Sequence, residues 1–199
     1  MGRGKRRSGG GKRSSSGWRN GLSIGTIALV VAMTIGGPLG SIIETVSLGT
    51  ATLILLASIA IAIASDIVAV AATAGQETPF NAMASDKVPG AREALVIVRN
   101  AEKVNSVFSD IVGDICGTVS GVAAAPIIRT ISQLYPGVPT ALVSMGVLGI
   151  VAFLTIGGKA AEKGFAVRAS TPVILTVGKA MYYLKQLNPS RRPRRRRSR

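Results

Sequence analysis

Residues 46–74 read VSLGTATLILLASIAIAIASDIVAVAATA and carry one charged side chain, Asp66. About 20 consecutive apolar residues are enough for a helix to cross the hydrocarbon core of a bilayer. The backbone finds no water there, so a crossing segment satisfies its hydrogen bonds as a helix. The stretch therefore predicts a transmembrane helix, and with it an integral membrane protein.

Three other segments approach the same length and apolarity. They are residues 22–43 and 138–158, which are uncharged, and residues 107–131, which contain Asp110, Asp114 and Arg129. We therefore expect an all-α membrane protein with about four transmembrane helices. A cleaved signal peptide is the alternative interpretation of residues 1–35, although no clear Ala-x-Ala site closes that apolar run.

Positive charge is concentrated at the two ends of the 199-residue chain, whose net charge is +15. Residues 1–20 contain seven Lys or Arg and residues 184–199 contain eight, whereas the nine basic residues between them are balanced by nine acidic ones. Basic segments next to spans favour the cytoplasm. With four spans, every strongly basic segment lies on one side. We expect a multi-pass protein of the inner membrane with both termini cytoplasmic.

Two segments outside the spans are expected to form amphipathic helices at the membrane surface. In residues 91–104, apolar side chains alternate with charged ones, after a polar connection with turn residues that include Pro79. In the second segment Pro172 marks the first turn, and an apolar stripe follows as far as Leu184.

The basic tails, residues 1–20 and 189–199, are expected to be disordered. Arginine and lysine near a membrane attract anionic lipid headgroups, which are the partners we expect. Nucleic acid, bound through the same tails, is the alternative partner.

Most enzyme classes lack their usual residues here. The chain has no His and one Cys, Cys116, which excludes His/Cys zinc sites, His-dependent catalytic triads and an intramolecular disulfide. Aromatic residues make up 4%, too few for the stacking platforms of single-strand binders. We expect no enzyme.

Ionisable side chains within spans cost free energy, so each one is a candidate functional residue. Asp66, Asp110, Asp114 and Lys159 are expected at similar depth near the cytoplasmic side. They would form either a vestibule for a hard cation such as Mg²⁺, which prefers oxygen ligands, or a structural Asp–Lys lock.

Small residues are spaced for close helix contact within the third predicted span. Asp110, Asp114, Gly117 and Gly121 follow a 4-3-4 spacing and share one helix face, and Gly113 begins two small-x-x-x-small steps. We expect a homodimer through such faces.

The order of segments over residues 57–185 resembles the membrane domain of the CNNM/CorC family of magnesium transporters. Ser65-Asp66-Ile67-Val68-Ala69 takes the place of the family's Ser-Glu-Thr-Ala-type motif, Gly113-Asp114-Ile115 that of Gly-Asn-Asn, and Gly158-Lys159-Ala160-Ala161-Glu162-Lys163 that of Gly-Glu-x-x-Pro-Lys. Lys159 replaces the family's Glu, and the paired CBS domains have no counterpart in this sequence.

The resemblance implies magnesium binding or transport. The expected metal site comprises Ser65, Asp66, Gly113, Asp114, Gly158 and Lys159, which lie in the matching motifs, and Asp110, which is included because it is expected at the same membrane depth. The resemblance divides the chain into a basic tail (1–20), an N-terminal transmembrane helix (21–45), a CNNM-like transmembrane domain (46–188) and an Arg-rich tail (189–199). A structural or regulatory protein with a locked, non-transporting bundle is the alternative function.

Overall fold

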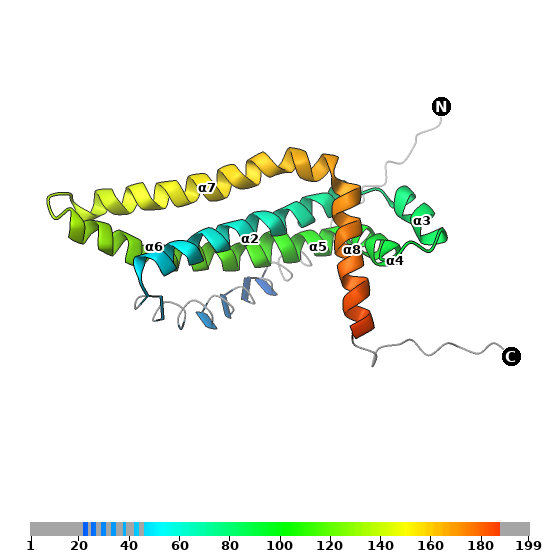
Figure 1. Cartoon of the computed structure of the whole chain (residues 1–199), viewed down its shortest axis with the longest axis horizontal. Coiled ribbons are helices and arrows are strands. Elements are labelled where there is room, and N and C mark those ends of the chain that lie inside the picture. The colour runs from blue at the N-terminus through cyan, green and yellow to red at the C-terminus, as the bar shows by residue number, and fades with distance from the viewer. Residues whose placement is uncertain are drawn as a thin grey trace, which may run out of the picture.

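The computed structural model describes residues 22–23, 25–26, 29–30, 33–34, 38, 42–43 and 46–187 (Figure 1). From residue 46 onward this part of the chain is helical apart from short turns. Its elements are α2 (Leu48–Ala74), α3 (Glu77–Ser85), α4 (Ala91–Arg99), α5 (Ala101–Asn105), the π-helix η1 (Ser106–Ile111), α6 (Val112–Leu134), α7 (Thr140–Arg168) and α8 (Ser170–Leu187). The all-α prediction is confirmed for the described residues.

Three helices are long and apolar enough to cross a membrane. They are α2, the continuous helix Ala101–Leu134 formed by α5, η1 and α6, and α7. They lie lengthwise beside one another (Figure 1). On α7, large apolar side chains such as Phe153, which is 75% exposed, point away from the bundle. Such a surface is suited to lipid, so the chain has the character of a multi-pass membrane protein.

The predicted spans at residues 46–74, 107–131 and 138–158 each fall on one of these long helices. The predicted helix at residues 21–45 lies largely outside the described residues, and both tails lie outside them entirely. The few described positions between 22 and 43 are helical.

α2 is the central element and packs against both α6 and α7. Small side chains bring α2 and α6 together: Ala123 and Ala124 are buried against Leu55 and Ile59. The hydroxyl oxygens of Ser58 and Ser120 form a hydrogen bond of 2.7 Å across the same interface. Close backbone approach and hydroxyl pairing are the means by which helices associate in lipid.

The helices α3, α4 and α8 form a separate group, the base layer, at the end of the bundle where α2 finishes (Figure 1). Its core surrounds the fully buried Phe80 and contains Ala71, Ala72, Ala94, Ile97 and Ile174. α8 runs crosswise to the three long helices (Figure 1).

Two glycines permit α4 and α8 to touch through their backbones. Gly90 precedes α4 with φ +83°, in the left-handed region that glycine adopts without strain. A Cβ on Gly178 of α8 would collide with the Gly90 carbonyl oxygen and lie 2.9 Å from the amide nitrogen of Ala94. The packing of α4 against α8 therefore requires glycine at both positions, because a side chain at either one would collide with the backbone of the other helix or its preceding turn.

Three boundaries differ from the expectation. The segment with Pro79, expected to be a polar connection, forms α3, because proline is tolerated in the first turn of a helix. The surface helix expected over residues 91–104 is divided at Asn100 into α4 and α5, and α5 continues into the span. α7 extends to Arg168, ten residues beyond its apolar part, because Ala, Glu and Lys favour helix outside lipid as well.

Candidate functional site

The polar end of α2 meets the π-helix at the candidate site. Asp66 is 4% exposed, and its Oδ1 accepts a 2.6 Å hydrogen bond from the Ser109 hydroxyl. The neighbouring Ser65 hydroxyl donates to the Phe108 carbonyl oxygen at 2.5 Å. Two consecutive residues of α2 thus bind two consecutive residues of η1. Short π-helical turns are frequent at functional sites.

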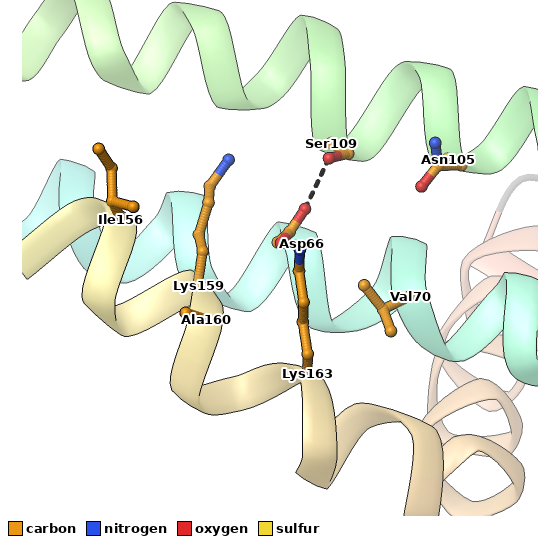
Figure 2. A pocket seen from close by; sticks show the side chains of 8 residues that line it. All are labelled: Asp66, Val70, Asn105, Ser109, Ile156, Lys159, Ala160 and Lys163. Carbon is orange, nitrogen blue, oxygen red and sulfur yellow. Dashed lines mark hydrogen bonds between the residues drawn. The ribbon is translucent and has the colours of Figure 1, made fainter.

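A cavity of about 380 Å³ opens beside Asp66, between α2, the α5–η1 junction and α7 (Figure 2). Its volume is sufficient for several water molecules. The lining residues are Asp66, Val70, Asn105, Ser109, Ile156, Lys159, Ala160 and Lys163.

Two lysines of α7, one helical turn apart, extend into this cavity (Figure 2). Within the described part of the chain, no carboxylate lies within ion-pair distance of either ammonium group. The Lys159 ammonium lies instead beside α6, where a Cβ on Gly113 would be 3.1 Å from its nitrogen. The described residues therefore show no ion pair between Lys159 and any Asp, which is the contact that the expected Asp–Lys lock requires.

Glu162 is the second buried carboxylate of the site. It is 8% exposed, and neither of its carboxylate oxygens has a hydrogen-bond partner among the described residues. Its carboxyl group lies within hydrogen-bonding reach of the Asp66 carboxyl on α2, so the two groups can share a proton, and it also interacts electrostatically with Lys163 and Lys159 on its own helix. A buried carboxylate is costly unless it is protonated or paired, so Glu162 and Asp66 require a proton or a cation between them.

Gly158 brings α7 close to α2 at this level. A Cβ on Gly158 would collide with Cδ1 of Ile63 and lie 3.2 Å from its Cγ1. Glu162 and Ala166 follow at four-residue spacing and are both buried, so these three positions form the face of α7 turned inward.

The structure brings together only part of the expected site. Asp66 and Lys159 line one cavity, with Gly113 beside the ammonium, and Ser65 and Gly158 hold the helices around it. Asp110 and Asp114 are exposed and do not line the cavity. The shared vestibule expected for all four ionisable groups is therefore wrong for these two, because the opposite face of α6, with Cys116 and Ser120, packs inward.

The small-residue face of α6 is turned outward in the single chain. Gly117 and Gly121 are exposed, and within 4 Å a Cβ on either would meet no described residue outside its own helix. No three His, Cys, Asp or Glu side chains of the described ranges converge as metal ligands.

Sequence reasoning assigned no site role to Ser109, Glu162 or Lys163. Glu162 carries a signal that could have been used, because it lies four residues after the helix-contact glycine Gly158 and so faces the same neighbour. Ser109 carries none, because its position depends on the π-helical turn.

Comparison with protein-family models, with curated proteins and with solved structures found no match. The resemblance to the CNNM/CorC family thus stays a prediction that rests on the order of the motifs.

Proposed function

We propose that this protein binds a small cation between Asp66 and Glu162 and moves it across the membrane. The observation that carries the proposal is the close approach of two buried carboxyl groups, Glu162 and Asp66, neither of which forms an ion pair with a described residue. Two carboxylates buried side by side repel each other unless a proton or a metal cation lies between them. A cation therefore supplies what this arrangement lacks.

The surroundings support exchange of the cation rather than permanent retention. The adjoining cavity gives room for its water shell, and Mg²⁺ in proteins keeps several waters while it binds one or two carboxylates. Lys159 and Lys163 lie near the pair, and neither forms an ion pair with a described residue. An ammonium group can take the cation's place when the site empties, so the lysines favour release.

The proposal keeps the magnesium class that the resemblance implies, but it changes the ligands. Asp66 retains its role, and Glu162 replaces the exposed Asp110 and Asp114. A proton is the simplest alternative occupant of the same pair.

The test uses the full chain in nanodiscs, titrated calorimetrically with Mg²⁺ and Na⁺ and followed by infrared spectroscopy across a pH series. We expect either binding of a metal cation or a protonated-carboxyl band, and loss of that signal in Asp66→Asn and in Glu162→Gln. Asp114→Asn and Glu102→Gln are matched controls, because both carboxylates are exposed, and both should retain the signal. Proteoliposome flux of the same ion should follow the same ranking.

Two results would refute the proposal. One is a wild-type protein that binds neither metal nor proton at this pair. The other is a signal that survives Glu162→Gln and disappears in Asp114→Asn, which would place the site on the outward face of α6.

A further inference from the structure

One side of α8 packs against the other helices of the base layer. Gly178 and Ile174 are buried there, and Gly178 touches the start of α4. Near the end of α8, the Lys185 ammonium donates to Glu93 Oε1 of α4 at 3.1 Å. These contacts determine which side chains of α8 remain uncovered.

The uncovered side chains are largely apolar. Met181, Leu184 and Leu187 recur at three-residue spacing, and Leu184 and Leu187 are 64% and 81% exposed. Tyr183, also exposed, lies next to this stripe. An apolar stripe that no described residue covers is suited to the boundary between headgroups and acyl chains, where tyrosine is enriched.

The direction of α8 fits that location. α2, α6 and α7 run lengthwise through the bundle, and α8 runs crosswise at one end of them (Figure 1). Since the long helices cross the bilayer, a helix crosswise to them lies along the membrane surface.

The charge that follows the stripe in the sequence indicates the kind of surface. Residues 188–199 follow α8 directly and contain seven Arg and no acidic residue. Lys179 adds a further exposed positive charge. Basic groups beside an apolar stripe favour an anionic lipid surface. The phosphate groups of the lipids attract the basic side chains, and the leucines are buried at the boundary with the acyl chains. A nucleic acid would leave the leucines in water.

We propose that the C-terminal half of α8 is inserted along the surface of an anionic bilayer leaflet through Met181, Leu184 and Leu187. The helix lies parallel to the membrane, with its apolar side about 5–10 Å below the headgroup level. This inference is independent of the cation site.

The full chain provides a direct test, because Cys116 is its only cysteine. In a Cys116→Ala background, single cysteines replace Leu184, Leu187, Gln186 or Lys179 and carry a spin label. The protein is reconstituted in phosphatidylcholine vesicles containing phosphatidylglycerol. Collision with oxygen, which concentrates in lipid, is compared with collision with a water-soluble nickel complex.

Labels at positions 184 and 187 should favour oxygen, and labels at 186 and 179, on another side of the helix, should favour nickel. This difference in oxygen and nickel collision between the two pairs of positions should become smaller when phosphatidylglycerol is omitted. An unchanged difference would refute the requirement for anionic lipid. Equal nickel access at all four positions would overturn the proposal. Protection of 184 and 187 from both reagents would also overturn it, in favour of a second copy of the chain, and protection that appears only with added RNA would do so in favour of nucleic acid.

Discussion

Gly158 of α7 lies against the side chain of Ile63 on α2 with no room for a Cβ between them. This contact holds the two helices together at the level of Asp66 and Glu162, so it determines how closely their carboxylates approach. It also provides the most local test of the bundle geometry.

Gly158→Ala should destabilise the protein by at most about 1 kcal/mol, because the atom nearest its Cβ is the terminal Cδ1 of Ile63, whose side chain can rotate away, and because alanine favours helix. Thermal unfolding in detergent measures the change. Gly157→Ala is the control, since a Cβ there would meet open space, and it should be neutral or slightly stabilising. Ile63→Val removes Cδ1 and should restore much of the stability lost in Gly158→Ala. A double variant no more stable than the single one would contradict this packing.

Ser109→Ala should cost about 1.5–3 kcal/mol, because it removes a hydrogen bond to a buried carboxylate. Ser144→Ala is the matched control. The Ser144 hydroxyl donates to the Thr140 carbonyl oxygen within its own helix at an exposed position, so its loss should change stability by less than about 0.5 kcal/mol. Equal losses in the two variants would show that Asp66 does not depend on Ser109.

Gly178→Ala should detach α8 from α4, because the added Cβ would collide with backbone atoms that no side-chain rotation can move. We expect faster amide exchange through α4 and the second half of α8, with α2, α6 and α7 unchanged. Gly164→Ala, on an open part of α7, should have no such effect. Unchanged exchange in Gly178→Ala would contradict the glycine contact.

Glu162→Gln should raise stability in the absence of metal cations by about 1–2 kcal/mol, because the neutral amide removes the repulsion between two buried carboxylates and can donate to Asp66. Chemical unfolding at neutral pH measures it, and Glu102→Gln serves as the exposed control. A loss of stability would indicate that the ionised Glu162 already has a counterion in the resting protein.

Hydropathy predicted the long helices of the described region because lipid imposes length and apolarity on a span. It placed α2 within two residues. It placed the end of α7 too early, because apolar content shows where lipid ends, and a helix continues into water when its residues favour it.

The site was predictable only in part. The cost of a charge within a span singled out Asp66 and Lys159 correctly as neighbours of one cavity. The same argument included Asp110 and Asp114, since spacing assigns residues to one face of α6 without showing which face is turned inward. The π-helical turn η1 brings Ser109 to Asp66 and changes which side chains face inward before α6. A sequence pattern with the 3.6-residue period of an α-helix does not predict such a turn.

A single residue, Ala169, separates α7 from α8. Its amide donates to the Phe165 carbonyl oxygen and its carbonyl accepts from the Val173 amide, so backbone hydrogen bonds run through the corner. Because these hydrogen bonds join the two helices, a movement of α8 toward or away from the bilayer centre would also move the end of α7. Lys163 lies six residues before Ala169, about 9 Å along the helix. A displacement of α8 along the membrane normal would therefore also move the end of α7 that carries Lys163, and with it one wall of the polar cavity.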